Sequence, residues 1–147
     1  MNTNPPILQD IRQPEHIALM GGDIFPHFTG ADTSGQAFAA FNIFPPGTGV
    51  PPHIHDLEDE AFYVQEGELE VLLGAETRRL KAGQSAWLPR NVPHAWSVAG
   101  DQPAKFLLVV TPAGLENLFR ELAALPADRL DAQTLDEIST RYRIKFL

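Results

Sequence analysis

The sequence predicts an all-β protein, an antiparallel sandwich or barrel that ends in one or two helices. Up to about residue 114, short apolar runs alternate with turns that contain most of the 13 prolines and 11 glycines. The hydrophobic period then changes to that of a helix. The length of 147 residues suits a single domain over 1–147, with the barrel at about 15–112 and a helical segment at about 114–145.

Several segments before residue 115 have the length of strands and are bounded by turn residues. The expected strands are 17–20, 36–44, 52–55, 61–65, 68–73, 76–80, 85–88, 95–98 and 105–110. Many short strands separated by Gly and Pro turns favour an antiparallel sandwich or barrel.

The chain after residue 114 has the pattern of helices. The segment 114–125, GLENLFRELAAL, places its large apolar residues along one stripe, which consists of Leu115, Leu118, Phe119 and Leu122. The segment 134–144, TLDEISTRYRI, is expected to form a second helix, with a capping box between Thr134 and Glu137. We expect this C-terminal segment to pack across the barrel.

Composition and charge argue against several classes of function. The formal net charge is −8 and no cluster of Lys and Arg is present, which argues against a nucleic-acid partner. The longest strongly apolar run, 106–110, is too short to span a membrane. The first residues lack the features of a signal peptide, and the absence of cysteine fits a reducing compartment. We therefore expect a cytoplasmic protein that binds neither nucleic acid nor membrane.

A first group of polar residues lies in PPHIHDLEDEAFYVQEGELEV, residues 51–71. His53 and His55 are two apart on an expected strand, so their side chains point to the same face. Glu60 is an odd number of residues away from both histidines, so a continuous strand would turn its side chain to the other face. The acidic turn DLED must therefore change the alternation, so that the next strand brings the Glu60 carboxylate to the face of the histidines. The three side chains can then converge on one point.

A second group lies in GQSAWLPRNVPHAWSV, residues 83–98, where Pro89 and Asn91 form a turn and His94 begins the next strand. Together the groups offer three imidazoles and one carboxylate, donors that suit Fe, Ni, Cu, Zn or Mn. Structural zinc sites in small domains more often use thiolates, which this chain lacks. Four protein ligands leave open positions on a five- or six-coordinate metal, so the pattern predicts a catalytic ion.

Both groups resemble the two motifs of the cupin family. The first motif has a glycine, H-x-H, a glutamate and a second glycine at cupin spacing, and the second has a glycine, a proline turn and a histidine. Asn91 replaces the usual glycine, a mild change because Asn tolerates the left-handed conformation, and Val98 replaces the usual asparagine. The resemblance implies a cupin jelly-roll β-barrel, with metal ligands His53, His55, Glu60 and His94.

Over about residues 15–145, the chain resembles small single-domain cupins similar to quercetin dioxygenases. This resemblance implies one divalent transition metal ion, Fe, Mn, Ni, Co or Cu, and a flavonol-type substrate opened by dioxygen. The imidazole donors also admit Zn. We predict a dioxygenase for a small aromatic or enolisable substrate, in which Glu60 is both a ligand and the catalytic base. The fold hosts many chemistries, so the motifs leave the substrate undefined.

Three further residues are candidates for the substrate pocket. Phe62 and Trp96 share strand parity with Glu60 and His94, although aromatic residues as a group belong mostly to the core. Asn42 is a lone polar residue in an apolar strand. These three residues are expected to line the space next to the metal.

We assign no functional role to four other polar residues. Glu58 and Asp59 could compete with Glu60 for the ligand role, but we interpret both as solvated members of the acidic turn. His16 and His27 have no partner at metal spacing and are read as surface or satisfied histidines.

Two other functions stay open beside the dioxygenase. One is a non-enzymatic cupin that binds or senses a small ligand at the metal. The other is a metal-dependent lyase or isomerase that works without dioxygen, with Tyr63 as a proton-transfer residue. A lone barrel leaves sheet edges uncovered, so we also expect a homodimer in which residues 7–11 pack on the partner.

Overall fold

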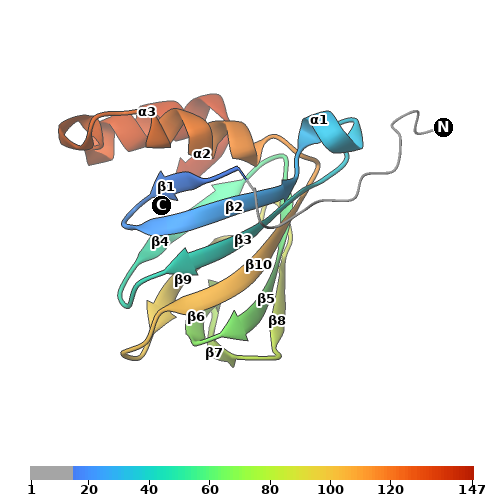
Figure 1. Ribbon diagram of the computed structural model, residues 1–147, viewed down its shortest axis with the longest axis vertical. Helices are drawn as coiled ribbons and strands as arrows, with labels where there is room; N and C mark the ends of the chain where they lie inside the picture. The colour runs from blue at the N-terminus through green and yellow to red at the C-terminus, as the bar shows by residue number, and fades with distance from the viewer. Residues whose placement is uncertain (1–14) are drawn as a thin grey trace.

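Two antiparallel β-sheets face each other in the computed structural model, which describes residues 15–147 (Figure 1). The six-stranded sheet has the order β1 (Ile17–Leu19), β2 (Gly22–Phe28), β3 (Phe38–Phe44), β10 (Ala104–Thr111), β5 (Asp59–Glu66) and β8 (Ser85–Leu88). The five-stranded sheet has the order β11 (Ile144–Phe146), β4 (Gly49–His55), β9 (His94–Ala99), β6 (Glu68–Leu73) and β7 (Glu76–Lys81). This arrangement is the predicted jelly roll.

The core lies between the sheets because each strand turns alternate side chains inward. The central strands of the six-stranded sheet show this most clearly. The buried row of β3 is Phe38, Ala40, Asn42 and Phe44, and that of β10 is Ala104, Phe106, Leu108 and Val110. Asn42 is the polar member of these two rows.

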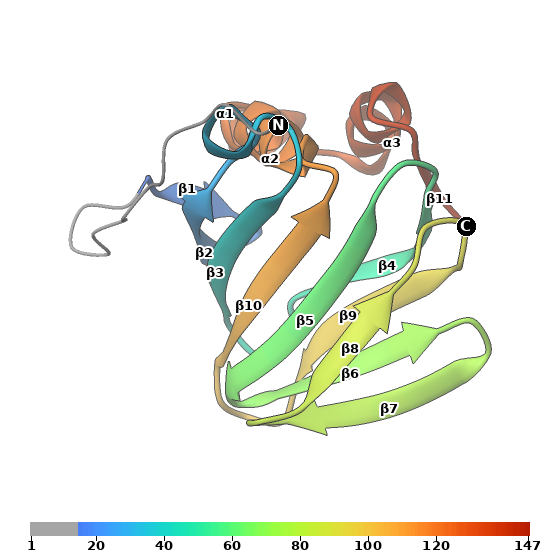
Figure 2. The same cartoon turned by 90° about the vertical axis from the view of Figure 1, so that its right-hand side faces the viewer.

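Two helices close one end of the space between the sheets (Figure 2). α2 (Leu115–Ala123) packs on β1, and α3 (Ala132–Arg141) packs on β11. The helical residues that join the core are Leu115, Leu118, Leu122 and Ile138. A short helix, α1 (Gly30–Thr33), and a 3-10 turn, η1 (Ala127–Arg129), occupy connections. Within residues 15–147, no helix has the length and apolarity needed to cross a membrane.

The sequence prediction missed two strands, β2 and β11. β2 contains Pro26, which has no N–H for a ladder hydrogen bond. The proline is accommodated because β1 pairs only with residues 22–24 and the β2–β3 register shifts just after Pro26. β11 has three residues and forms where the chain returns to β4, with Ile144 opposite His55.

The predicted capping box at Thr134 is wrong. α3 begins earlier, and its N-cap is Asp131, whose carboxylate accepts a hydrogen bond from the Thr134 N–H at 2.8 Å. Glu137 instead accepts a hydrogen bond from Gln133 at 2.8 Å. Asp131 provides the cap one turn before the predicted position, so Thr134 lies inside the first turn of the helix.

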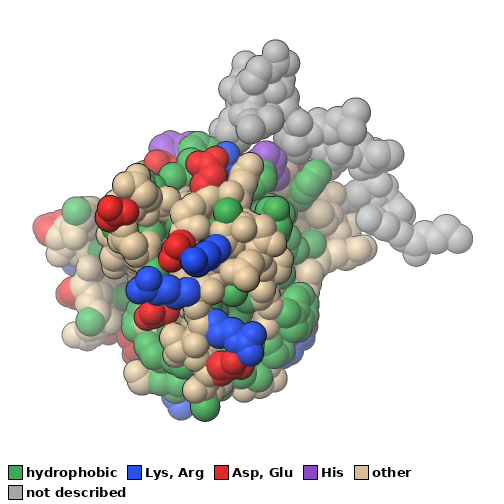
Figure 3. Space-filling view, turned by 90° about the horizontal axis from the view of Figure 1, so that it is seen from below, with side chains coloured by type: hydrophobic (Ala, Val, Ile, Leu, Met, Phe, Trp, Pro, Cys, Tyr) green, Lys and Arg blue, Asp and Glu red, His purple; other side chains and the backbone are tan. Residues whose placement is uncertain are grey.

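Acidic and basic side chains lie next to each other on the face opposite the helices (Figure 3). On the β6–β7 hairpin, Arg79 lies 3.9 Å from Glu68 and 3.8 Å from Glu70. Arg78 contacts Glu76 at 2.5 Å on the same hairpin. The charges on this face therefore balance locally.

Candidate metal centre

Two neighbouring strands of the five-stranded sheet supply three imidazoles. β4 turns His53 and His55 inward, as their spacing of two residues requires, and His94 begins β9. In the β4–β9 pairing, His53 lies opposite His94, and their ring centroids are 4.3 Å apart. All three side chains are buried.

Glu60 reaches the same point from the facing sheet. The turn 56–58 separates β4 from β5, and β5 then directs Glu60 inward. Its Oε2 lies 3.1 Å from Nε2 of His94 and 3.8 Å from Nε2 of His55. The four side chains therefore form one buried cluster, with a donor atom from each within 4.8 Å of the others.

Backbone carbonyls fix the orientation of two of the imidazoles. Nδ1–H of His53 donates to the carbonyl oxygen of Pro51 at 2.8 Å, and Nδ1–H of His94 donates to that of Val92 at 3.1 Å. A carbonyl oxygen can only accept, so the proton of each neutral ring lies on Nδ1. The lone pair of Nε2 is then free for a cation.

Glu58 orients the third imidazole. Its Oε2 lies 3.2 Å from Nδ1 of His55, and both side chains are buried. The interpretation of Glu58 as a solvated turn residue is therefore wrong, because the turn folds this carboxylate inward behind the histidine. A carboxylate in this position fixes the tautomer of an imidazole ligand and increases its basicity. Asp59 is not simply solvated either, because it pairs with Arg90 at 2.7 Å.

The electrostatics of the cluster suit the binding of a cation. Burial, together with the charge of His94, lowers the pKa of His53 to about 4, so this ring is neutral at neutral pH. Burial opposes ionisation of Glu60, but the contact with His94 and the positive charge that the neighbouring histidines can carry outweigh it and lower the pKa of Glu60. For His55, burial is outweighed by the hydrogen bond to Glu58 and the charge of Glu60, which raise its pKa. Because its pKa is lowered, Glu60 is an anion at neutral pH.

A single divalent transition ion fits these donors. Nitrogen and oxygen ligands lie about 2.0–2.2 Å from such an ion, which places them roughly 3–4 Å from one another. The four donors here lie within 4.8 Å of one another. Three imidazoles and a carboxylate suit Fe, Mn, Ni, Co, Cu or Zn.

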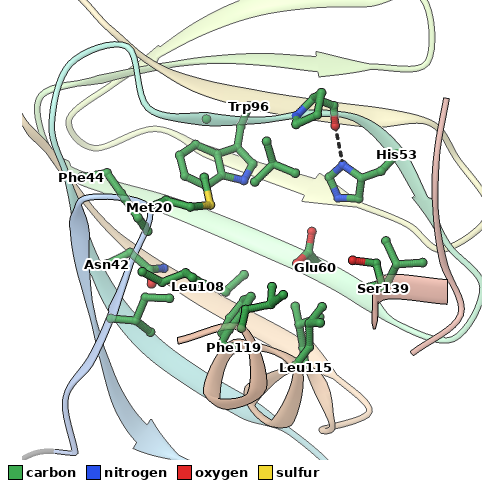
Figure 4. A pocket seen from close by; sticks show the side chains of 18 of the residues that line it. Met20, Asn42, Phe44, His53, Glu60, Trp96, Leu108, Leu115, Phe119 and Ser139 are labelled. Atoms are coloured by element: carbon green, nitrogen blue, oxygen red, sulfur yellow. Dashed lines mark hydrogen bonds between the residues drawn. The ribbon is translucent and has the colours of Figure 1, made fainter. Parts of the chain in front are cut away.

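The cluster opens into a cavity of about 300 Å³ between the sheets (Figure 4). His53, His55 and Glu60 form part of its wall. Aromatic side chains from both sheets line the rest, among them Phe44, Phe62, Trp96 and Phe106. The helices close it with residues that include Leu115, Leu118, Phe119, Leu122, Leu135 and Ser139. The cavity is therefore apolar apart from the cluster and a few polar side chains.

The three predicted pocket residues, Phe62, Trp96 and Asn42, all lie on the cavity wall. The rings of Phe62 and Trp96 meet edge to face, with centroids 6.3 Å apart. Asn42 is 2% exposed, and among residues 15–147 its Oδ1 has no hydrogen-bond partner. A role of these residues toward a substrate stays a prediction.

Tyr63 lies on the opposite side of the sheet. Phe62 points inward, so its neighbour Tyr63 points outward and is 46% exposed, in a shallow groove with Trp87. Tyr63 therefore does not face the cluster, and the predicted role in proton transfer is wrong. His16 also lies outside the cluster, paired with Asp23 at 2.6 Å.

The contribution of the C-terminal helices to the cavity was not predicted. Ser139 on α3 is 1% exposed and lies on the cavity wall, as does Phe119 on α2. The helical stripe of α2 indicates which of its faces is buried. It does not indicate that this face closes a cavity next to a polar cluster.

The two departures from the cupin motifs leave the cluster intact. Asn91 has a φ of 62°, the left-handed conformation expected of it, and its N–H donates to the carbonyl oxygen of His55 at 2.8 Å. Val98 is 3% exposed and lies opposite Leu69 of β6. Asn91 supports the end of the strand that carries His55 of the cluster, and Val98 belongs to the core.

Comparison with known proteins identifies the family of this chain. The cupin domain matches residues 40–110, which contain all four cluster residues. CurC of Streptomyces cyaneus, named a polyketide synthase, is 34% identical over 116 residues, which cover 76% of this chain and 73% of CurC. The chain therefore belongs to the cupin family.

Other relatives differ in length and in name. Quercetin 2,3-dioxygenase of Aspergillus japonicus is 29% identical over 128 residues, which cover 80% of this chain but 36% of that enzyme. KdgF from Halomonas sp. has a structure similar to this one, with a TM-score of 0.68 and 21% identity over 77% of this chain and 99% of KdgF. At that identity, the structural likeness shows the fold alone.

Proposed function

We propose that this cupin is a metal-dependent dioxygenase that opens a small aromatic or enolisable substrate such as a flavonol. The observation that carries the proposal is the position of the cluster: three buried imidazoles and a carboxylate lie together, and His53, His55 and Glu60 form part of the wall of a mostly apolar cavity. Such a cavity takes an apolar organic molecule and presents its polar end to the ligands. The similarity to quercetin 2,3-dioxygenase supports this choice of reaction.

His53, His55, Glu60 and His94 would hold one divalent ion, Fe, Mn, Ni, Co, Cu or Zn. When bound, the ion would supply a Lewis acid for adjacent substrate oxygens and, if redox-active, the electron transfer that dioxygen chemistry needs. The chain supplies the remaining parts of the reaction, which are binding, orientation and proton transfer.

Glu60 would accept the proton of an enolic or phenolic hydroxyl group on the substrate. Its carboxylate is ionised at neutral pH and lies on the cavity wall, where a hydroxyl group of the substrate can reach it. Loss of this proton leaves an electron-rich enolate, which dioxygen attacks, and both oxygen atoms enter the product. Trp96 and Phe62 would hold a planar substrate and exclude water.

The names of the relatives support two classes of substrate. Quercetin is a flavonol, with a hydroxyl group next to a carbonyl group. CurC is named a polyketide synthase, and polyketide chains contain β-dicarbonyl groups that enolise readily. Both classes combine adjacent or nearby oxygens with an acidic proton, so flavonols and β-diketones belong in one screen.

Oxygen uptake tests the proposed reaction. Metal-loaded protein is mixed with each flavonol or β-diketone, and dioxygen and substrate are followed together. We expect one dioxygen consumed per substrate, and no reaction with His53→Ala/His55→Ala protein. Tight binding without turnover would identify the non-enzymatic alternative, and conversion without oxygen uptake would identify a lyase or isomerase.

We also propose a homodimer formed through the outer face of the six-stranded sheet. Tyr63 and Trp87 are 46% and 55% exposed there, beside Leu107 and Val109, and β8 is an edge strand. Exposed aromatic residues next to an open edge are typical of protein interfaces. The predicted contact through residues 7–11 lies outside the described residues. Light scattering at micromolar concentration should give the mass of two chains, and Trp87→Glu should give the mass of one.

The proposed setting is the cytoplasm, with a small molecule as the partner rather than nucleic acid or membrane. The absence of cysteine and the net charge of −8 support this setting.

A further inference from the structure

Asn42 interrupts the apolar wall of the cavity. Its inward neighbours along β3 are Ala40 and Phe44. Its partners on the adjacent strands are Phe106 of β10 and Ile24 of β2. An apolar side chain would suit this position better than an amide if packing alone decided it.

The side-chain oxygen of Asn42 lacks a hydrogen-bond partner among residues 15–147. The residue is 2% exposed, and among residues 15–147 no donor reaches its Oδ1. A buried carbonyl oxygen without a hydrogen bond destabilises the folded protein, and native structures keep few of them. Because Asn42 lies on the cavity wall, a molecule inside the cavity can supply the missing donor.

Asn42 is distant from the metal cluster. In the six-stranded sheet, Asn42 lies opposite Phe106 and Glu60 lies opposite Val110, four residues further along β10 (110 − 106 = 4). At about 3.3 Å per residue, the separation along the strand is about 13 Å. Figure 4 shows Asn42 on the side of the cavity near Phe44, away from His53. A ligand that touches both ends is therefore longer than one aromatic ring.

The wall near Asn42 is aromatic. The ring of Trp96 lies 5.3 Å from those of Phe44 and Phe106, and Phe62 lies 5.4 Å from Phe106, measured between centroids. Flat rings at these distances offer favourable contacts to another flat, apolar body. A planar, apolar group would therefore suit the middle of the cavity.

We propose that Asn42 is a specificity-determining residue, whose Oδ1 accepts a hydrogen bond from a hydroxyl group at the end of the substrate away from the metal. This inference rests on the proposed function, because it takes the other end of the substrate to lie at the cluster. A hydroxyl group both donates and accepts, so it suits either orientation of the amide. The substrate class narrows to elongated, planar molecules with chelating oxygens at one end and a hydroxyl group at the other.

A series of flavonols tests the inference by binding. The parent probe is 3-hydroxyflavone, which has adjacent carbonyl and hydroxyl oxygens, and the derivatives carry one more hydroxyl group at successive positions of the remote phenyl ring. For metal-loaded wild-type protein, we expect at least one derivative to bind about 10-fold to 100-fold more tightly than the parent. Asn42→Leu should abolish that preference. It should also raise the melting temperature without ligand, because it removes the unpaired carbonyl.

Ser139→Ala is the matched control, because it removes another buried polar side chain from the same cavity. We expect this variant to keep the preference for the hydroxylated derivative. If Asn42→Leu keeps the preference, or if wild-type protein binds all the flavonols equally, water satisfies Oδ1 and the inference is overturned.

Oxygen uptake in the same samples separates this inference from the proposed function. A preference that depends on Asn42, without oxygen uptake, would support the inference and overturn the dioxygenase. Turnover of all derivatives, bound with equal affinity, would support the dioxygenase and overturn the inference about Asn42. If no flavonol binds, the inference is overturned, whereas the dioxygenase is overturned only if the β-diketones of the screen also fail to react.

Discussion

The cavity has two halves that differ in how their polar atoms are satisfied. In the half that holds the cluster, the Nδ1 atoms of His53, His55 and His94 each have an acceptor. In the other half, the Oδ1 atom of Asn42 has no partner among residues 15–147, and the surrounding wall is aromatic. The first half is organised in advance for an ion, whereas the second leaves one hydrogen bond for a ligand to complete.

The two halves also differ in origin. The imidazoles come from two paired strands, and one turn brings the carboxylate from the facing sheet. The rest of the cavity wall combines β3 and β10 of one sheet, β9 of the other, and both C-terminal helices, of which α3 lies beside the cluster (Figure 4). The cluster therefore depends on local spacing, and the rest of the wall depends on how distant elements pack.

The largest effect is expected from His53→Ala/His55→Ala. Removing two of four donors should reduce the metal content from about one ion per chain to nearly none, as measured by elemental analysis of purified protein. His16→Ala is the matched control, because His16 is exposed and pairs with Asp23 outside the cluster. Full metal content in the double variant would mean that the ion lies elsewhere, and the comparison of the two halves would fail.

Glu60→Gln tests whether the cluster half also performs proton transfer. The substitution keeps the volume and one oxygen donor but removes the charge and the proton acceptor. If Glu60 is the general base, turnover should fall about 10²–10⁴-fold even when excess metal restores full occupancy. If Glu60 is only a ligand, activity should recover with the metal. Turnover on the substrate found in the screen, at measured metal occupancy, distinguishes these outcomes.

Glu58→Gln tests the side chain that orients His55. Glu58 holds Nδ1 of His55, and partners of this kind typically change metal affinity about 10–100-fold when they are replaced. We expect a loss in that range, measured by competition with a chelator of known affinity. Glu66→Gln makes the same chemical change at an exposed position near the end of β5 and should leave the affinity unchanged. Equal affinities of the two variants would reduce Glu58 to a packing role.

The common face of His53 and His55 was predictable because strand geometry is local, whereas the membership of Glu60 and His94 in the cluster was implied by the cupin resemblance. A spacing of two residues places His53 and His55 on one face whatever the rest of the chain does. The role of Glu58 was not predictable in the same way. An acidic turn reads as solvated, and only the folded path of residues 56–58 directs one of its carboxylates inward.

The fold was predictable in class and in most strands, for the same local reason. Glycine and proline turns separate the alternating runs, and eight of the nine expected strands lie within two residues of the observed bounds at both ends; the exception is 52–55, because β4 begins at Gly49. β11 could not be predicted, because three residues form a strand only when β4 is already in place. The cavity could not be predicted either, since it depends on the packing of α2 and α3 over both sheets.

The smallest effect is expected from Asp131→Ala, which tests whether the helical part of the cavity wall can be weakened without loss of the ion. Asp131 caps α3, and α3 contributes Ser139 to the cavity wall. Loss of the cap should lower the melting temperature by a few degrees. Metal content should stay at one ion per chain, because no ligand lies on α3. Asp136→Ala, at an exposed position within the same helix, is the control and should have little effect.

The pH dependence of this difference identifies its cause. The hydrogen bond from the Thr134 N–H holds the pKa of Asp131 below its usual value. A carboxyl group with a lowered pKa in the folded state stabilises the protein above its unfolded pKa, and this contribution disappears as the pH falls through the folded pKa. The difference in melting temperature between wild type and Asp131→Ala should therefore be complete at pH 7 and shrink as the pH falls below about 4. A difference that stays constant with pH would assign the effect to helix packing rather than to the charged cap.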